Sequence, residues 1–539
     1  MTHLDELLPP MKWNAWGDPA AAKPLSDGIR SLLKQVVGLE DSQQVELDAG
    51  QVQLRPSALS QADQDALAGI VGAEFCRTDD RDRLLRAGGK STIDLLRRKD
   101  SGAQDAPDAV LLPGGPSGED TVAEILRYCS EHGIAVVPFG GGTSVVGALN
   151  PTRGKFSAVV SLDLRRFNRL VSLDEVSGEA VLGAGVTGPD AERLLGEHGF
   201  SLGHFPQSFE FATIGGFAAT RSSGQDSAGY GRFDDMVRGL RMITPVGTID
   251  LGRAPASAAG PDLRQLLLGS EGTFGVITQV RVRVHRAPED VRYEAWSFPD
   301  FATGAAALRA VTQNATGPTV VRLSDEAETG VNLATTEAIG ENQITGGCLG
   351  ITVFEGTKEH VESRHAETSA LLAAQGGTSL GEGPAQAWEH GRFGAPYLRD
   401  SLLSAGALCE TLETATDWSN VPALKAAVTE ALTTALAKTG TPALVMCHIS
   451  HVYPTGASLY FTIVAGQRGN PIEQWQAAKK AASDAIVAAG GTITHHHAVG
   501  ADHRPWMRDE IGDLGVQVLR AVKATLDPAG ILNPGKLIP

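Results

Sequence analysis

The sequence predicts an α+β protein in which two large domains follow an N-terminal helical extension. Three observations predict this fold class. The chain has 539 residues, which is more than a single domain usually holds. Hydrophobic residues make up 42% of it and charged residues 20%, so it can bury sizeable cores and is not disordered. The sequence pattern also changes twice, at Asp108 and after Pro288.

Residues 1–104 have a polar, helical pattern, and residues 105–288 alternate short strands with helices. Apolar residues recur with helical spacing over residues 120–131, which predicts one buried helix face. A buried strand follows at residues 134–138. Further strands are predicted at residues 158–162, 170–173, 179–183, 240–244, 248–251 and 275–285, with a helix at residues 189–197.

Residues 289–525 form the second domain, in which strands are combined with longer helices. Strands are predicted at residues 293–298, 319–323, 349–354, 443–452 and 458–464. Helices are predicted at residues 301–313, 358–373, 421–438 and 473–489. Two of these helices end in similar Gly-Gly-Thr segments, at Thr378 and Thr492, which predicts a duplicated unit. Residues 526–539 form a turn-rich tail that we expect to return to the first domain.

Charge and cysteine content exclude several classes of function. Lysine and arginine number 46 against 63 aspartate and glutamate residues, a net charge of −17, so we expect no nucleic-acid partner. The five cysteines are scattered and form no Cys-x-x-Cys pair, which argues against a disulfide framework and for a reducing compartment. Residues 1–10 lack the pattern of a signal peptide and no run of 18 apolar residues occurs, so we expect a cytoplasmic protein.

One apparent nucleotide motif has a simpler interpretation. Gly183-Ala-Gly-Val-Thr-Gly188 fits the dinucleotide fingerprint G-x-G-x-x-G between a strand and a helix. It lies far into the chain, however, and residues 200–206 make a poor second parallel strand. The acidic residue near the required spacing, Glu210, is not at a strand end. We therefore interpret the segment as a strand–turn–helix junction in which glycine permits close packing.

Three other segments rich in small residues are more informative. Gly140-Gly-Gly142 follows a buried strand, and backbone N–H groups of such a loop can converge on an anion, with Thr143 and Ser144 adding hydroxyl donors. No Lys-Ser/Thr pair follows, so the loop is not a Walker motif. Taken alone, it is equally consistent with a plain turn. A second such segment spans residues 206–224 and a third residues 268–277.

These three segments, in this order, resemble the flavin-binding domain of the vanillyl-alcohol-oxidase (p-cresol methylhydroxylase, PCMH) superfamily over roughly residues 105–288. The resemblance implies a two-subdomain PCMH-type FAD-binding domain followed by an α+β substrate (cap) domain with an antiparallel sheet. It implies FAD contacts from Pro138, Phe139, Gly140, Gly141, Gly142, Thr143, Ser144, Pro206, Gln207, Ser208, Thr213, Gly215, Gly216, Ser223, Gly224, Glu271, Thr273 and Ile277. Covalent members attach flavin through histidine or cysteine, and the glycine loop has neither, so we expect non-covalent FAD.

Six of the fourteen histidines fall near the C-terminus: His448, His451, His495, His496, His497 and His503. If the triplet lies on a strand, His495 and His497 share one face and His496 takes the other. From the residues alone, three interpretations stay open. These are a metal site, a general acid/base cluster, and one functional histidine with structural neighbours.

The same region resembles two branches of flavin enzymes. Hydroxyacid dehydrogenases such as D-lactate and glycolate dehydrogenases hold a metal with H-x-G-D-G-N-x-H and a later E-H-G. Here Tyr460 replaces the second histidine, and His496-His497-Ala498 stands where Glu-His-Gly would be. Two ligand positions are therefore changed. This disfavours a metal-assisted dehydrogenase, which remains the alternative function, and we expect no metal.

The alkyldihydroxyacetonephosphate synthase family matches better and over nearly the whole chain. Its M-K-W-N-G-W-G resembles residues 11–17, its I-R-L-M-D residues 321–325 and its Y-I-R-D residues 397–400. Its S-H-H-H-G-V-G resembles residues 494–500. The departures are Ala498 for glycine, His451 for glutamine, and the absence of a recognisable peroxisomal signal.

This resemblance implies an enzyme of ether lipid synthesis that exchanges the acyl group of acyl-dihydroxyacetone phosphate for a fatty alcohol through an adduct at flavin N5. Tyr460 would be the acid/base on the substrate, and His495, His496 and His497 would activate the alcohol or orient phosphate. Arg322 and Arg399 would bind phosphate or the leaving carboxylate. We expect a small lipid substrate, a homodimer and a peripheral contact with a membrane.

Overall fold

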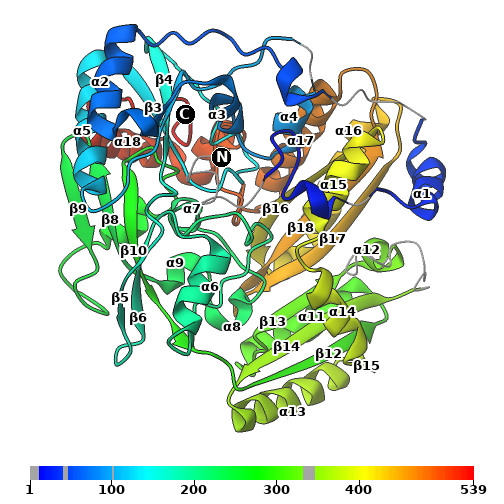
Figure 1. Cartoon of the computed structure of the whole chain (residues 1–539). Helices are drawn as coiled ribbons and strands as arrows, with labels where there is room; N and C mark the ends of the chain where they lie inside the picture. The colour runs from blue at the N-terminus through cyan, green and yellow to red at the C-terminus, as the bar shows by residue number, and fades with distance from the viewer. Residues whose placement is uncertain (1–10, 23, 41–46, 100–101, 332–345) are drawn as a thin grey trace.

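The computed structural model describes residues 11–22, 24–40, 47–99, 102–331 and 346–539 (Figure 1). It has the predicted α+β fold, with three main sheets and helices packed against them. The interpretation of residues 1–10 as lacking a signal peptide lies outside the described residues.

The first sheet has the strand order β1-β2-β4-β3. Its strands β2 (Ala109–Leu111), β4 (Ala158–Asp163) and β3 (Ile134–Phe139) are parallel, and β1 (Cys76–Arg77) pairs antiparallel with β2. Helix α5 (Gly118–His132) buries its predicted apolar face and ends at Gly133, whose φ of 65° is the left-handed conformation that glycine adopts readily. The next strand, β3, is a continuous apolar run because parallel strands are covered on both faces.

The second sheet is antiparallel, with strand order β5-β6-β10-β8-β9. Its strands are β5 (Leu170–Asp174), β6 (Glu179–Gly183), β10 (Val276–Arg283), β8 (Val237–Thr244) and β9 (Gly247–Leu251). Helices α6 (Gly188–Gly196) and α7 (Ile214–Thr220) contribute to the hydrophobic core on this sheet. The two sheets together make the two-subdomain first half.

The second half is built on a seven-stranded antiparallel sheet of order β15-β12-β14-β13-β17-β18-β16. Its strands are β12 (Asp290–Phe298), β13 (Val320–Ser324), β14 (Cys348–Gly356), β15 (Thr378–Gly381), β16 (Ala407–Asp417), β17 (Ala443–Val452) and β18 (Gly456–Gly466). Its longest helices are α11 (Phe301–Gln313), α13 (Lys358–Ala374), α16 (Val421–Ala437) and α17 (Pro471–Ala488).

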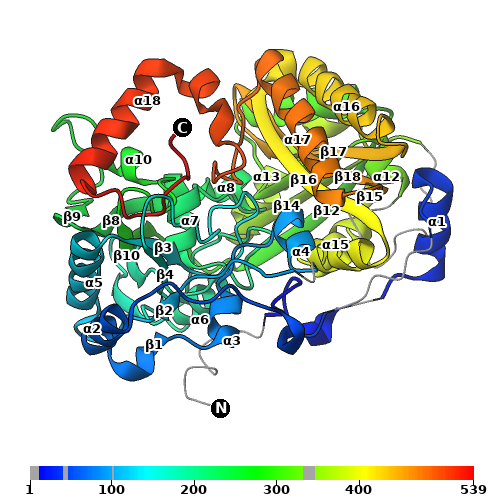
Figure 2. The ribbon, with the colours of Figure 1, turned by 90° about the horizontal axis from the view of Figure 1, so that it is seen from above.

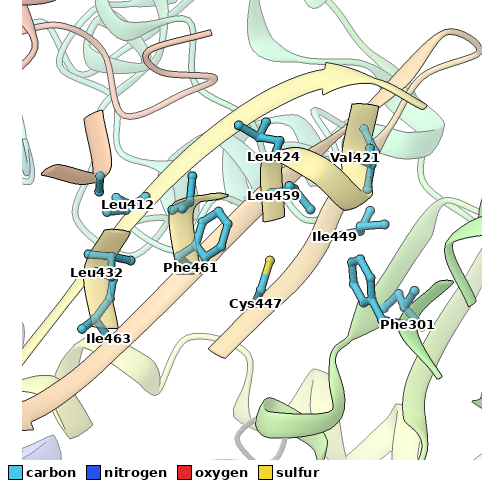
Figure 3. Close-up of a cluster of buried hydrophobic side chains, with 14 of the residues drawn as sticks. Phe301, Leu412, Val421, Leu424, Leu432, Cys447, Ile449, Leu459, Phe461 and Ile463 are labelled. Carbon is cyan, nitrogen blue, oxygen red and sulfur yellow. The ribbon is translucent and has the colours of Figure 1, made fainter. Parts of the chain in front are cut away.

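The duplicated unit predicted from the helix ends is present in the topology. The order β12-α11-β13-β14-α13 repeats as β16-α16-β17-β18-α17, and the first unit has in addition the short helix α12 (Glu326–Gly330) between β13 and β14. The two units meet where β13 pairs with β17, with Ser324 opposite His448. The main core lies between the sheet and its helices, and Figure 3 shows part of it, where Phe461, Leu459 and Leu432 meet.

The N-terminal segment and the tail both pack onto the two halves. The segment predicted as a helical extension also supplies strand β1, and its helix α4 (Thr92–Arg97) lies against the second half, where the Thr92 hydroxyl donates to the Cys409 carbonyl at 2.7 Å. Figure 2 shows helix α18 (Met507–Leu526) over the first half, with the C-terminus beside it. The tail continues back into the first sheet, since Leu532 forms a parallel bridge with Val136.

Several elements were not predicted from the sequence, above all β16 and α18. The remaining α-helices within the described residues are α1 (Asp27–Val37), α2 (Gln61–Val71), α3 (Asp80–Leu85), α8 (Ser227–Tyr230), α9 (Phe233–Met236), α10 (Leu263–Leu267), α12 (Glu326–Gly330), α14 (Gly383–Gly391) and α15 (Ala395–Ser404). The short strands β7 (Phe200–Ser201) and β11 (His285–Arg286) pair with each other. Among the described residues, none of these helices has the length and apolar character that crossing a bilayer requires.

Candidate active site

A cavity of about 380 Å3 lies between the two halves. The glycine loop and the segments around residues 206–224 form one wall, and the sheet of the second half forms the other. All the residues predicted to contact FAD line it except Thr273. Thr273 is buried instead, and its carbonyl accepts a hydrogen bond from Lys523 Nζ at 2.7 Å.

The glycine loop leaves no room for side chains where it crosses the next segment. A Cβ added to Gly141 would lie 1.9 Å from the carbonyl oxygen of Phe211, and one added to Gly140 would lie 2.4 Å from Thr213 Oγ1. Gly142 also has a φ of 74°, which disfavours any residue with a side chain. The loop therefore presents bare backbone to the cavity, as the binding of a pyrophosphate requires.

Buried polar atoms around this wall also fit a bound flavin nucleotide. Gln207 Nε2 and Ser223 Oγ have no hydrogen-bond partner among the described residues, although both side chains line the cavity. A buried donor without a partner costs about 1–3 kcal/mol, so such atoms mark where a ligand supplies the missing partner.

Tyr460 projects from β18 into the same cavity. Its ring stacks on His448, with centroids 4.8 Å apart, and the rings of His496 and His497 lie 6.0 and 5.6 Å from it. Burial raises the pKa of Tyr460 to about 12, so its phenol stays protonated at neutral pH. The hydroxyl can therefore donate a hydrogen bond inside the site.

The histidine triplet is not on a strand, so the alternation of side chains that a strand would give does not apply. The triplet forms a loop folded around the buried carboxylate of Glu413 on β16. Glu413 accepts hydrogen bonds from the backbone N–H groups of His495, His496 and His497 at 2.5, 3.2 and 2.8 Å. The hydroxyl of Thr494 donates to it as well, at 2.5 Å. As a result His496 and His497 line the cavity, whereas His495 lies outside its lining.

The Glu413 carboxyl is ionised in this position. Burial by itself would raise the pKa of the carboxyl, but the three facing imidazoles and the Thr494 hydroxyl hold that pKa well below its usual range. Glu413 is therefore an anion at neutral pH, and it fixes the conformation of the loop through charge-assisted hydrogen bonds.

A second buried carboxylate holds the other end of the loop. Glu271, from the first half, accepts hydrogen bonds from the backbone N–H groups of Gly500 and Val499 at 2.9 and 3.2 Å. Burial raises the pKa of Glu271 to about 7 despite these donors. Glu271 was predicted to contact FAD, and although it lines the cavity, its carboxylate binds the histidine loop.

His451, His495 and His496 come together beside this loop, and one nitrogen of each lies within 4.8 Å of the others, a spacing that could hold a cation. In the structure these rings have protein partners. His451 Nε2 donates to the carbonyl of Gly224 at 2.9 Å, and His495 Nε2 lies 2.5 Å from the hydroxyl of Tyr453. Burial lowers the pKa of all three histidines, that of His451 to about 4, so their rings are neutral at pH 7.

Both predicted arginines line the cavity, with different surroundings. Arg322 binds the buried carboxylate of Glu328 and lies 2.9 Å from His448 Nδ1, while its Nε has no partner among the described residues. Arg399 Nη1 donates to the carbonyl of Lys90 at 2.7 Å, and two other nitrogens reach Asp400 at 3.3 Å. Arg322 thus retains a buried donor for a ligand, whereas Arg399 is mostly used within the protein.

Sequence reasoning missed the link between the N-terminal segment and this cavity. Trp16 lines it and packs edge-on against Phe211, with ring centroids 5.5 Å apart. Its backbone N–H binds Asp400. The buried Lys90 ammonium donates to the carbonyls of Lys12 and Ala15 at 2.7 and 2.6 Å. The signal was available, because the Trp-rich segment at residues 11–17 stood out, but only the fold brings it to the site.

Comparisons with known proteins agree with this geometry. A family model described as an FAD binding domain matches residues 107–251, and one described as the C-terminal domain of FAD linked oxidases matches residues 287–537. FAD is therefore the cofactor. An alkyldihydroxyacetonephosphate synthase of Trypanosoma brucei brucei is 32% identical over 98% of this chain and 92% of its own length. The chain belongs to the alkyldihydroxyacetonephosphate synthase family.

Solved structures agree with this assignment. A crystal structure of an alkyldihydroxyacetonephosphate synthase matches with a TM-score of 0.82 and 29% identity, covering 98% of this chain and 99% of the other. The crystal structure of p-cresol methylhydroxylase matches with a TM-score of 0.67 and 15% identity, covering 89% of this chain and 98% of the other. This second match confirms the predicted PCMH-type fold and carries no argument about activity.

Proposed function

We propose that this protein is an FAD-dependent alkyldihydroxyacetonephosphate synthase, which replaces the acyl group of an acyl-dihydroxyacetone phosphate by a fatty alcohol. One observation carries the proposal. A neutral phenol, Tyr460, and two imidazoles, His496 and His497, line the same cavity as the glycine loop that fits the FAD pyrophosphate. When bound, FAD supplies a ring nitrogen that can form and release a bond to a substrate carbon.

The lining of the cavity suits both the polar and the apolar part of such a substrate. Arg322, with its unpartnered buried Nε, provides a permanent positive charge for a phosphate. Apolar side chains from α15 and the sheet also line the cavity wall: Leu398, Leu402, Met446 and Val464. Because burying each CH2 group contributes about 0.8 kcal/mol, this wall favours a long alkyl chain over a short hydroxyacid.

The protein's own residues would handle the protons of this exchange. Tyr460, held protonated by burial, would donate a hydrogen bond to a substrate oxygen on the carbon that changes its substituent. His496, neutral and at the cavity wall, can take a proton from the incoming alcohol or give one to the departing carboxylate. Arg322 would hold the phosphate, which would keep the reacting carbon positioned next to the catalytic groups.

The test uses the purified holoenzyme under anaerobic conditions. We expect labelled hexadecanol to be incorporated into an ether lipid from palmitoyl-dihydroxyacetone phosphate, with no net oxidation or reduction of the flavin. D-lactate and glycolate should leave the flavin absorbance unchanged. Bleaching of the flavin by either hydroxyacid, without ether formation, would support the FAD-linked hydroxyacid dehydrogenase instead and would refute this proposal.

Four expectations accompany the proposal, each with its own measurement. FAD should be non-covalent, since the glycine loop has no histidine or cysteine, and acid precipitation should release it into the supernatant. The protein should be a homodimer by light scattering. It should be cytoplasmic by cell fractionation. It should bind the surface of vesicles in flotation assays, where its lipid substrate resides.

A further inference from the structure

A row of hydrogen bonds leads away from the cavity through the histidine loop. Tyr453 Oη lies 2.5 Å from His495 Nε2, and His495 Nδ1 lies 3.0 Å from His496 Nδ1. His496 lines the cavity, whereas Tyr453 lies at the turn between β17 and β18 beside the exposed Pro454 and Thr455. The row therefore connects the site to the side of the molecule where solvent is near.

The donors and acceptors in this row are restricted by chemistry. Two Nδ1 atoms 3.0 Å apart form a hydrogen bond only if one of them carries a proton and the other does not. Since both rings are neutral, His495 and His496 must then be in opposite tautomers. The guanidinium of Arg232 faces the Tyr453 hydroxyl and can only donate, which leaves the hydroxyl proton of Tyr453 free to point at His495 Nε2.

We propose that Tyr453, His495 and His496 form a proton relay between the catalytic cavity and solvent. The proposal rests on the proposed function, in which a carboxylate leaves and an alcohol enters. His496 is the catalytic residue that touches the substrate. His495 and Tyr453 act through it and set its tautomer.

The relay balances the protons of the exchange. In the first state Tyr453 donates to His495 Nε2, His495 Nδ1–H donates to His496 Nδ1, and His496 Nε2 carries a proton. As Nε2 gives that proton to the departing carboxylate, each proton in the row moves one place toward the cavity, and solvent reprotonates Tyr453. His496 is then bare at Nε2 and accepts the proton of the alcohol, and the reverse shift returns one proton to solvent.

The surroundings of the relay keep its members neutral. Burial and the neighbouring imidazoles lower the pKa values of His495 and His496, and Arg232 acts in the same direction, while the Glu413 carboxylate opposes them. Burial raises the pKa of Tyr453 to about 12. A shift in which every member gains one proton as it loses another avoids both an imidazolium and a tyrosinate.

The first test is Tyr453→Phe in the holoenzyme, with Tyr293→Phe as the control, because Tyr293 lies on β12 of the large sheet and outside the cavity lining. We expect Tyr453→Phe to lower kcat by 10- to 100-fold, with KM for the acyl substrate and the flavin spectrum unchanged. The solvent isotope effect should change from a curved to a linear dependence on deuterium fraction. Wild-type kcat with the curved dependence intact would overturn the relay.

The second test does not depend on turnover. Nitrogen-15 NMR of the holoenzyme should show His495 protonated at Nδ1 and His496 protonated at Nε2, and Tyr453→Phe should remove this preference in His495. If Tyr453→Phe does not fold, His495→Asn keeps a donor near the Nδ1 position but cannot pass a proton, and it should lower kcat similarly. Identical tautomers in both rings, or resonances that change on dialysis against EDTA, would show that no shared proton joins them. A protein without synthase activity but with the predicted tautomers would refute the function and not the relay.

Discussion

Glu413 Oε1 accepts a hydrogen bond from the backbone N–H of His497 at 2.8 Å, so a strand of the large sheet directly holds the histidine loop. Replacing this carboxylate by an amide, Glu413→Gln, should disturb the loop because an amide nitrogen would face N–H donors. We expect a loss of about 1–3 kcal/mol in the free energy of unfolding, from buried donors left unsatisfied. Urea denaturation monitored by flavin fluorescence measures it, and kcat should fall at least tenfold.

Glu294→Gln is a suitable control for this variant. Glu294 accepts hydrogen bonds from Ser369 and Ser379 at 2.8 and 2.6 Å, far along the same sheet. The Glu294→Gln variant should lower the free energy of unfolding without lowering kcat. Equal kcat values for the two variants would show that Glu413 has no special part in holding the loop.

The role of Glu413 also shows what sequence reasoning could and could not reach. The elements with regular patterns, such as α11 and β17, were predicted with their correct bounds, because apolar spacing alone defines them. Strand β16 was missed because Glu410 and Glu413 interrupt its apolar run. Glu410 Oε2 accepts a hydrogen bond from the backbone of Thr92, and Glu413 accepts hydrogen bonds from the histidine loop, so both carboxylates serve residues more than 80 positions away.

The glycine loop and the histidine triplet show the same difference between features set by local sequence and features set by distant contacts. The loop was recognised because its function requires consecutive glycines, a feature of local sequence. The triplet was recognised as chemically important, but its loop conformation was not predicted. Its loop conformation is imposed by two carboxylates from distant segments, Glu413 and Glu271, and no spacing within the triplet records them.

Tyr460→Phe should abolish turnover while leaving FAD binding intact. The hydroxyl is the only polar atom removed, and the ring keeps its stacking with His448 at 4.8 Å. Ether lipid formation should fall by at least 100-fold, which is within the range for loss of a general acid. The absorbance spectrum and the melting temperature report on the cofactor and the fold. Normal turnover by this variant would remove Tyr460 from the mechanism.

Gly141→Ala should prevent FAD from being retained. Its Cβ would lie 1.9 Å from the Phe211 carbonyl oxygen, so the loop must move away from the segment that completes the site. We expect the variant to purify without yellow colour. The ratio of flavin absorbance to protein absorbance measures how much FAD it retains. Gly196→Ala is the matched control, because no atom of the described residues lies within 4 Å of its added Cβ. A yellow Gly141→Ala protein would contradict the assignment of this loop.

The two carboxylates that hold the histidine loop should respond to pH in opposite directions. The folded pKa of Glu271, about 7, is above the unfolded value near 4.5, so the stability that its protonation contributes is complete below about pH 4.5 and is lost as pH rises through 7. Glu271→Gln, neutral at every pH, should therefore gain stability relative to the wild type over this range. The gain should approach about 3 kcal/mol, from 1.36 kcal/mol per pKa unit.

Glu413 should behave in the reverse sense. Its folded pKa is below the unfolded value, so its contribution is present above about pH 4.5 and is lost as pH falls further. The deficit of Glu413→Gln relative to the wild type should therefore be largest at neutral pH and shrink on acidification. Urea denaturation of the three proteins between pH 4 and 8 compares the two differences directly. Parallel pH profiles for both variants would mean that the two carboxyl groups ionise alike, contrary to the different surroundings that the structure gives them.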